Sequence, residues 1–456
     1  PRAAALAQAA GLPRRLMGDR RSGIAPAWDG LREIVIENDI AWRIHTMVEF
    51  MFGRPVRLAS AAPDPQRAAI IGRVVESVWE ASGGIGLLQD LALLAHVYGH
   101  ADLVLRIDDA AAALGASADP ADAPARAAEA LRIEIVEPTR GVPVMDAADP
   151  RRLAAYVIHT PAAAPAEVDR TSLVQGRSRW LRVLAGALGS PPRPQTPATA
   201  EVLTAAGRRI FTVRPDEETA RLVDETPAPV DLGRVPVVHI QNLSQPFCYE
   251  GLGEVEPLIP LQDELNTRLS DRASRVTMQS FKMYLAKGLD GFENAPVGPG
   301  RVWSTDNPEA SIESFGGDAA SPSEDRHIEE IREALDKASG VPPLATGVVR
   351  ARVGNLTSEN ALRLTLTGLL SRTMRKRITY GRGLVEMSSL VLAALDALGI
   401  FRTAPRERTV RVEWPDPLPR DEREQVLVAQ MKRDLGVPAE RLLAELGYAS
   451  ADPGVV

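Results

Sequence analysis

The stretch from residue 256 to residue 280 constrains the fold of this chain more than any other part of the sequence. Its apolar side chains recur at three- and four-residue spacing, and charged side chains of both signs fall on the opposite face. A helix of about 25 residues spans on the order of 37 Å. The sequence therefore predicts a long rod with an apolar stripe on Leu258, Leu261, Leu265, Leu269, Ala273 and Val276, and a charged face on Asp263, Glu264, Arg268, Asp271, Arg272 and Arg275.

A second rod is predicted after a small module. Residues 282–319 contain short apolar runs between glycines and prolines, which is typical of strands joined by turns. Ser321 and Glu324 then match a capping box, with Pro322 at the first helical position. This pattern predicts a helix over residues 321–340, whose apolar stripe comprises Ile328, Ile331, Leu335 and Ala338.

A loop separates this second helix from a third and longer one. Pro342 and Pro343 stiffen the start of the loop, and Gly347 and Gly354 can act as hinges. Thr357 can cap the helix that follows, over residues 358–400. We expect that helix to bend at one or more of Gly368, Gly381 and Gly383. Later patterns predict a strand at 408–416 and helices at 420–436 and 439–447.

The first 255 residues change from helical to strand-like patterns. Helices are predicted at 28–53, 64–83 and 86–99, and strands at 101–108, 131–137, 152–159, 209–214 and 234–241. Two Ala- and Pro-rich segments, 109–130 and 186–202, should be mobile because they bury little apolar surface. We expect residues 1–25 to form a flexible arm rather than a targeting peptide. The fold class that results is α+β.

Composition excludes several classes of protein. Apolar residues make up 45% and charged residues 25%, as in soluble globular proteins. The net charge of −7 argues against a protein that grips nucleic acid over its whole surface. One cysteine, Cys248, rules out an intrachain disulfide framework and suits a reducing compartment. The most apolar stretch, 384–400, contains Glu386 and Asp396, so we interpret it as a packed helix rather than a membrane span.

A search for catalytic motifs finds no convergent set. No Gly-Lys pair occurs, so a P-loop is excluded, and "GLGEVE" at 251–256 lacks the third glycine of a dinucleotide fingerprint. His96 and His100 could share a helix face and hold a metal, but we favour two histidines that are partly buried or at the surface. Cys248 is interpreted as a core residue rather than a nucleophile. The chain is therefore predicted not to be an enzyme and to need no cofactor or metal.

The order of these parts resembles the portal protein of tailed bacteriophages, of the long-tailed siphophage type. Four passages carry the resemblance: "GLGEVEPLIPLQDELNTRLSD" (251–271), "SGVPPLATG" (339–347), "LTSENALRL" (356–364) and "VEWPDPLPRDERE" (412–424). They are similar to the family's entry into its first stem helix, its passage through the tunnel loop into the long helix, and its entry into the crown. The likeness covers residues 240–450 well, and upstream it depends on "VYGHADLVLRID" (97–108).

The resemblance implies an elongated subunit that forms a ring of about twelve copies, a closed cyclic assembly. Double-stranded DNA would be packaged and ejected through this ring at one capsid vertex. The implied parts are an N-terminal arm (1–25), a wing (26–255), stem helices (256–280 and 321–340), a clip (281–320), a tunnel loop (341–357), the long wing helix and strand (358–417), and a short helical crown (418–456).

The resemblance also implies sites and partners. The tunnel-loop residues are Val348, Val349, Arg350, Arg352 and Asn355; the stem residues are Arg268, Arg272, Arg275, Glu329, Glu333 and Lys337; the clip residues are Lys287, Phe292, Glu293, Arg301 and Trp303. The clip would receive the terminase large subunit and later a head–tail adaptor. Major capsid and scaffold proteins would be further partners, and no membrane is involved. The protein would lie in the virion, and in the host cytoplasm during assembly.

Two questions stay open at the level of sequence. Arg350 and Arg352 would share one face of an extended loop and could touch passing phosphates, or they could be two solvated arginines. The charged faces of the stem helices could pair with neighbouring subunits. The alternatives to a portal are another oligomeric capsid-associated or scaffold protein without a DNA channel, a soluble enzyme with an Ala/Pro-rich insertion, and a DNA-binding regulator, which the acidic charge disfavours.

Overall fold

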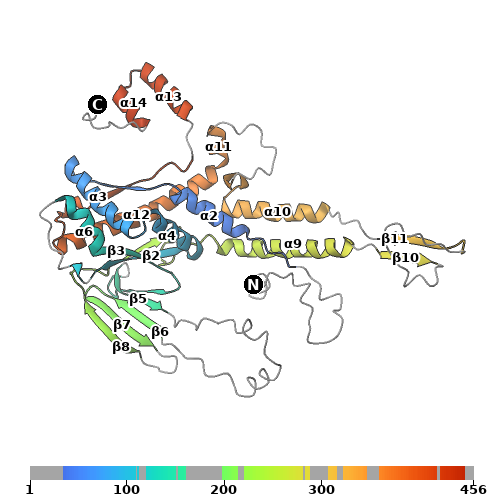
Figure 1. Ribbon diagram of the computed structural model, residues 1–456, viewed down its shortest axis with the longest axis horizontal. Coiled ribbons are helices and arrows are strands. Elements are labelled where there is room, and N and C mark those ends of the chain that lie inside the picture. The colour runs from blue at the N-terminus through green and yellow to red at the C-terminus, as the bar shows by residue number, and fades with distance from the viewer. Residues whose placement is uncertain are drawn as a thin grey trace, which may run out of the picture. The chain divides into compact units, whose positions relative to one another are not determined.

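A computed structural model describes residues 34–108, 110–111, 120–149, 152–160, 198–213, 220–280, 283–287, 307–315, 322–346, 359–418 and 422–446. Two compact units emerge from the contacts between residues. Unit 1 comprises residues 1–43 and 256–343, and unit 2 comprises residues 44–255 and 344–456. Helices and sheets occur in both units, which confirms the predicted α+β class (Figure 1).

Unit 1 is built around two long helices. Helix α9, Ile259–Ser280, follows the 3₁₀ turn η4, Glu256–Leu258, and lies beside α10, Pro322–Ser339 (Figure 1). Strands β10, Met283–Lys287, and β11, Ser311–Phe315, form an antiparallel ribbon between them in the sequence. Both predicted rods and the strands of the intervening module are therefore confirmed.

The two rods share one apolar core. Its buried members are Leu258, Leu265, Leu269, Ile328, Ile331 and Leu335. Each such side chain contributes about 1.5–3 kcal/mol when it leaves water. The predicted stripes were wrong at their ends, because Val276 is 42% exposed and Ala338 is exposed, while Ser339 takes the buried position.

Unit 2 contains a layer of helices. Its helices include α2, Asp39–Phe52, which begins in unit 1, α3, Pro65–Ala81, α4, Gly84–Tyr98, α11, Glu359–Thr365, and α12, Thr367–Ala397. Asp64 caps α3 by accepting from the backbone N–H groups of Gln66 and Arg67, as its position before Pro65 predicts. Turns η5, Pro343–Thr346, which begins on the last residue of unit 1, and η6, Pro405–Glu407, in unit 2, are short 3₁₀ segments.

Three antiparallel sheets lie in unit 2. A three-stranded sheet has the order β3-β2-β9, from Leu131–Val136, His100–Ile107 and Val237–Gln241. A five-stranded sheet has the order β4-β5-β6-β7-β8, from Gly141–Met145, Leu153–Thr160, Ala198–Leu203, Gly207–Val213 and Arg221–Pro227. Strand β1, Arg57–Ser60, pairs with β12, Val410–Glu413. A core that includes Val104, Tyr156, Leu203 and Val237 joins the two larger sheets.

Helix α12 packs on strand β9 at a point that requires glycine. A Cβ atom at Gly383 would lie 2.3 Å from Cγ1 of Ile240, so only a residue without a side chain permits this approach. The long helix is interrupted at Leu366, between α11 and α12, two residues before Gly368, and Gly381 and Gly383 lie within the continuous helix α12. Gly383 therefore serves close packing instead.

The segment 109–130 corrects the prediction of a mobile loop. Its described part forms the turn η3, Pro120–Asp122, and helix α6, Ala123–Ala130, which packs against α3. Ala123, Ala127 and Ala130 are buried, because small side chains at helical spacing allow two helices to approach closely. The end of the segment 186–202 likewise belongs to β6. The alanine- and proline-rich composition of the two segments did not indicate this helix or this strand.

Two short helices follow β12 in the sequence. They are α13, Glu422–Asp434, and α14, Ala439–Glu445, close to the predicted bounds. At the other end of the described chain, residues 34–38 are not helical, so the helix predicted over 28–53 begins at Asp39 in the part that can be seen. Among the described helices, none is both long and apolar enough to cross a membrane.

Candidate functional site

The charged faces of α9 and α10 bind each other within one chain. Arg272 Nη1 lies 2.9 Å from Asp325 Oδ1, and Arg275 is paired with Glu324. Arg268 Nε lies 2.7 Å from Glu264 Oε1, on the next turn of α9. The three arginines that we expected to be available to neighbouring subunits therefore have carboxylate partners inside the subunit.

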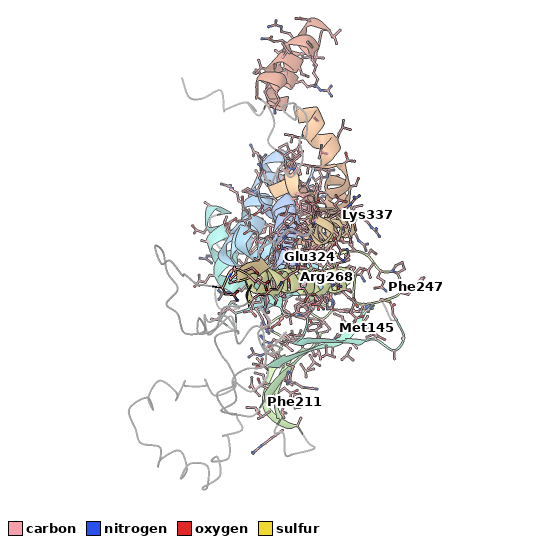
Figure 2. The ribbon with its side chains drawn as sticks, turned by 90° about the vertical axis from the view of Figure 1, so that its right-hand side faces the viewer. Met145, Phe211, Phe247, Arg268, Glu324 and Lys337 are labelled. Atoms are coloured by element: carbon pink, nitrogen blue, oxygen red, sulfur yellow. The ribbon has the colours of Figure 1, made fainter. Side chains whose placement is uncertain are left out.

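Three other predicted stem residues are exposed on α10. Glu329, Glu333 and Lys337 lie one turn apart, on the side of α10 away from its buried stripe, and have no ion pair with the described part of the chain. Figure 2 shows Arg268, Glu324 and Lys337 in unit 1. Glu329, Glu333 and Lys337 are thus the charges that α10 leaves available to another molecule.

A polar row on α9 holds the backbone of residues 35–40. Gln262, Asn266 and Ser270 are spaced four residues apart and accept hydrogen bonds from the N–H groups of Ile40, Glu37 and Val35, at 3.2, 3.0 and 3.0 Å respectively. Val35 and Ile40 also pack against the apolar core of the rods. Residues 34–43 thus belong to unit 1 and not, as the family resemblance implied, to a wing over residues 26–255. The only sequence signal was the polar spacing on α9, which is weak by itself.

Arg43 is a buried charge in unit 1. Its side chain is fully buried, and its guanidinium lies 3.3 Å from Asp39 and also pairs with Asp336 of α10. It lies 4.2 Å from the ring of Trp42, a cation–π distance. Removing one partner of a buried pair is costly because the other charge stays buried. This site ties α10 to the start of α2.

A second buried network lies beneath α12 in unit 2. Lys376 Nζ is 2.7 Å from Glu254 Oε1 and 2.9 Å from His96 Nε2. His96 Nδ1 lies 2.6 Å from the Ala92 carbonyl oxygen, which only accepts, so Nδ1 donates there and Nε2 accepts from the lysine. Burial and then the Lys376 charge lower the pKa of His96. Burial also lowers the pKa of Lys376, to about 8, against the opposing effect of Glu254.

A third network surrounds Asp102 in strand β2. Its carboxylate accepts from the hydroxyls of Tyr156, at 2.6 Å, and Tyr249, at 3.0 Å, and lies 2.6 Å from His239 Nδ1. His239 Nε2 faces the Tyr249 carbonyl oxygen at 2.6 Å. Burial and the Asp102 charge raise the pKa of Tyr156 and of Tyr249, so both hydroxyls remain donors. The arrangement fastens the segment after β9 to the sheet.

The two histidines considered as a metal pair belong to separate surroundings. His96 contacts Lys376, whereas the His100 ring lies 5.4 Å from His239 and 5.7 Å from Tyr249. Both are buried. Within the described ranges, no group of three or more His, Cys, Asp or Glu side chains could hold a metal ion.

The segment 243–252 presents an aromatic side chain to solvent. An isolated bridge joins Leu243 to Leu252, and Gln241 donates to the carbonyl oxygens of Cys248 and Tyr249. Phe247 has a φ of 66°, the left-handed region, and its side chain is fully exposed. Cys248 is also exposed, so its interpretation as a core residue was wrong. Figure 2 shows Phe247 projecting from unit 2 on the same side as Met145.

Most of the remaining predicted site residues lie outside the described part of the chain. These are the tunnel-loop residues Val348, Val349, Arg350, Arg352 and Asn355, and the clip residues Phe292, Glu293, Arg301 and Trp303. The N-terminal arm, residues 1–25, lies outside it too. Lys287 is described: it ends strand β10 and is exposed, opposite Ser311 in the register of the ribbon.

A comparison with protein families identifies the chain. The model for "Phage portal protein, SPP1 Gp6-like" matches residues 198–448, which is more than half of the sequence. The chain belongs to this family of portal proteins. The matched region runs from β6 through the paired rods and α12 into α14. The resemblance seen in the sequence is therefore confirmed, and the polar networks above are structural features of a portal protein.

Solved structures give matches that cover the whole portal protein chain at low similarity. They include the neck of an empty GTA particle computed with C6 symmetry (TM-score 0.45) and the virion of a native gene transfer agent particle (TM-score 0.45). Both have 13% sequence identity and cover 95% of this chain and 98% of the other. The neck of a native GTA particle computed with C12 symmetry matches with TM-score 0.44 and 13% identity, covering 97% and 98%. A search of curated proteins found no match.

Proposed function

We propose that this portal protein forms a ring-shaped channel at one capsid vertex, through which double-stranded DNA is packaged and ejected. The observation that carries the proposal is the family match across residues 198–448, which includes the two rods, the ribbon and the long helix. A pair of rods that shares one core gives a stiff element, since neither helix can bend without opening that core. A channel wall that is built from stiff subunits can keep its shape while DNA moves through it. The role is structural rather than enzymatic.

We infer that α9 and α10 act as the stem and that the module over 281–320 acts as the clip. The ribbon β10–β11 connects the two rods in sequence, so it is held at the same end of both. Lys287 is exposed there. This module would receive the terminase large subunit during packaging and a head–tail adaptor afterwards. The corresponding division of the remaining chain is a wing over 44–255 and 358–417, a tunnel loop over 341–357 and a crown over 418–456, with residues 34–43 held on the stem.

The net negative charge of the chain supports the passage of DNA through the ring without tight binding. Each chain carries a net charge of −7, so a ring of about twelve copies would repel a polyanion overall. Each arginine or lysine contact with a phosphate adds affinity by releasing counterions. Arg350 and Arg352 on the tunnel loop would therefore make weak, transient contacts with phosphates as the duplex moves past them.

Contacts between subunits would use charges that the subunit leaves available. Because Arg268, Arg272 and Arg275 have partners within the chain, we assign the stem contact with a neighbour to Glu329, Glu333 and Lys337 instead. Such contacts are heterologous, and they close into a ring when the rotation per subunit fits. The protein would reside in the virion and assemble in the host cytoplasm, with capsid and scaffold proteins as further partners and no membrane.

The clip assignment and the channel can be tested together in a packaging assay. A variant in which residues 283–315 are replaced by a short Gly-Ser linker should still assemble, but it should not recruit the terminase large subunit and should package no DNA. Glu76→Ala, at an exposed position of α3 outside the clip, is the mild control and should retain packaging. DNA packaging that persists at the wild-type level without the ribbon would contradict the clip assignment. Particles that package DNA without this protein would contradict the portal function.

A second assay addresses the tunnel loop. Arg350→Glu with Arg352→Glu should lower genome retention, because two guiding cations become repelling anions in every copy. Arg326→Glu, at an exposed arginine on α10, is the control for a charge reversal outside the tunnel loop. Unchanged packaging and retention in the double variant would remove the role of these arginines and leave them as solvated loop residues.

A further inference from the structure

The outer face of α12 is apolar and exposed in the subunit. Met374 and Ile378 on this face are 60% and 65% exposed, and Leu364 of the preceding helix is 77% exposed. Positions 367, 371, 374, 378, 385 and 389 recur at helical spacing, so they lie along one side of α12. A monomeric soluble protein rarely leaves such a stripe in water. The face therefore points to a partner.

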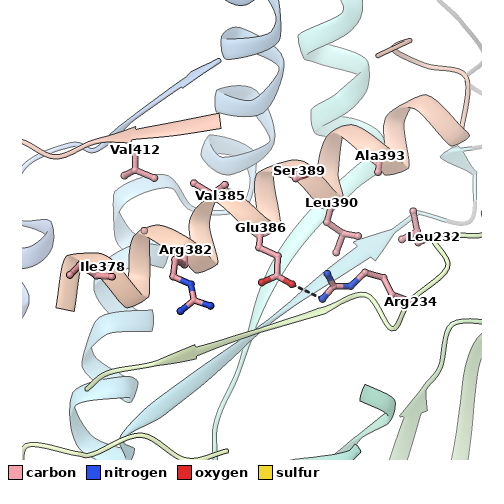
Figure 3. A pocket seen from close by; sticks show the side chains of 11 residues that line it. Leu232, Arg234, Ile378, Arg382, Val385, Glu386, Ser389, Leu390, Ala393 and Val412 are labelled. Atoms are coloured by element: carbon pink, nitrogen blue, oxygen red, sulfur yellow. Dashed lines mark ion pairs between the residues drawn. The ribbon is translucent and has the colours of Figure 1, made fainter. Parts of the chain in front are cut away.

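Two grooves follow each other along this face. One, of about 590 Å³, is lined by residues that include Leu370, Ser371 and Met374. The other, of about 670 Å³, is lined by residues that include Ile378, Val385 and Ala393 (Figure 3). Gly381, Ser389 and Ala393 are small, which lets another backbone approach α12 closely. A long shallow channel of this kind fits a helix better than a small molecule.

Cations border the channel on α12. Arg375 and Arg382 are exposed and have no ion pair with the described residues, whereas Arg234 on the opposite wall is paired with Glu386 at 2.7 Å. Figure 3 shows Arg382 beside Ile378 on the helix, and the Arg234–Glu386 pair facing it. A helix that occupies the channel should therefore carry an acidic side chain beside its apolar stripe.

Helix α13 of the same chain has these properties. Leu427 and Met431 of α13, and Leu435 directly after it, are spaced four residues apart and are 51%, 57% and 86% exposed. Val428, at 42% exposure, widens the stripe. Asp434 borders the stripe, and its ion pair with Arg433, at 3.6 Å, is exposed and contributes little. The residues of α13 that face away from this stripe, Gln425 and Ala429, are half-buried.

We propose that α13 of one subunit lies in the α12 channel of the next subunit around the ring. The inference rests on the proposed ring, and it names a contact within it. A stripe and a groove on different elements of one chain make a head-to-tail contact, and repeating that contact produces a closed ring when the geometry permits. Leu427, Met431 and Leu435 fill the channel between Met374 and Ile378. Asp434 approaches Arg375 or Arg382.

Cysteine cross-linking distinguishes contact between subunits from contact within a subunit. In a background with Cys248→Ser, the variant with Ile378→Cys and Met431→Cys should form disulfides that link neighbours into a ladder of covalent oligomers up to the full ring. The control pair Ile378→Cys with Arg433→Cys, on the opposite side of α13, should cross-link at least tenfold less. A covalent product that stays at monomer mass would overturn the proposal, because α13 would then be folded onto its own α12.

Charge substitution gives a second test that does not depend on cross-linking. Met431→Glu with Leu435→Glu should reduce the ring fraction at least tenfold, and adding Ile378→Lys should restore part of it. Arg433→Glu changes the charge equally but lies off the stripe, and it should leave the ring fraction unchanged. Rings that form normally with the double glutamate would overturn this contact alone. A monomeric wild-type protein would contradict both this contact and the proposed portal function.

Discussion

At the scale of single residues, the portal subunit contains charged groups that are buried but paired. Lys376 and Glu254 are 2% and 3% exposed and lie 2.7 Å apart, and Arg43 is fully buried between Asp39 and Asp336. Such pairs contribute little net stability, because desolvation offsets the attraction between the charges. Their effect is to make the free energy of one arrangement of the neighbouring elements much lower than that of any other. A misplaced helix would leave a charge unpaired in an apolar environment.

The titration of Lys376 yields a prediction for stability against pH. Burial lowers its pKa to about 8 in the folded protein, against about 10.4 in an unfolded chain. Between these values the unfolded state binds more protons, so the contribution of Lys376 to stability increases as pH rises. Urea unfolding at pH 7 and pH 9.5 should therefore show wild type gaining about 2 kcal/mol relative to Lys376→Met. Parallel pH dependences for the two proteins would contradict the lowered pKa.

At the scale of elements, close packing between a helix and a strand explains residue choices that the periodicity of the sequence does not explain. Gly383 and Gly381 lie two residues apart in α12 and have opposite surroundings. A Cβ atom would meet Ile240 at 2.3 Å from Gly383, but from Gly381 it would meet only Trp414, at 3.6 Å. The two positions therefore form an internal comparison for the contact between α12 and β9.

Alanine substitutions at these glycines should have effects of opposite sign. Gly383→Ala should destabilise the protein by about 1–3 kcal/mol through overpacking against Ile240. Gly381→Ala should be neutral or stabilise it by up to about 1 kcal/mol, because alanine favours helix more than glycine does. Thermal unfolding of both variants provides the measurement. Equal effects at the two sites would argue against the close approach of α12 and β9.

The salt bridges of the stem lead to a further prediction for the elements. Removing Arg268, Arg272 and Arg275 together by alanine substitution should cost little stability, because all three pairs are partly exposed to solvent and screened by it. It should not abolish ring assembly, since these groups face their own subunit. Lys337→Glu should weaken assembly more than the triple variant does. Native mass spectrometry at increasing salt would rank the two, and the reverse ranking would return the arginines to the contact between subunits.

The sequence allowed the rods, their core and most of the helices to be predicted, because amphipathic periodicity is local. Ile328, Ile331 and Leu335 are buried as the spacing indicates. The break at Leu366, the helix within the Ala- and Pro-rich segment and the exposed Phe247 could not be predicted in this way. The buried alanines of α6 depend on a partner far away in sequence, helix α3. The polar networks around Lys376 and Asp102 likewise join residues more than 50 positions apart.

At the scale of the whole molecule, the subunit has several apolar and charged surfaces that are exposed to solvent. The exposed stripes of α12 and α13 and the charges on α10 all lie on the outside of one chain. In the proposed ring, the net charge of −7 would be multiplied by the number of copies, which would favour passage of DNA over retention by the wall. We propose that these surfaces form the contacts between subunits of that ring.

The decisive experiment is to determine the mass of the purified assembly together with its projection image. We expect an integer multiple of the 49.1 kDa chain, on the order of twelve copies in a closed cyclic arrangement, with a central hole visible end-on. Dissociation at high dilution should give monomers without partial rings of fixed size. A stable monomer, or an oligomer whose projections show no central hole, would contradict the claim that this portal protein encircles DNA.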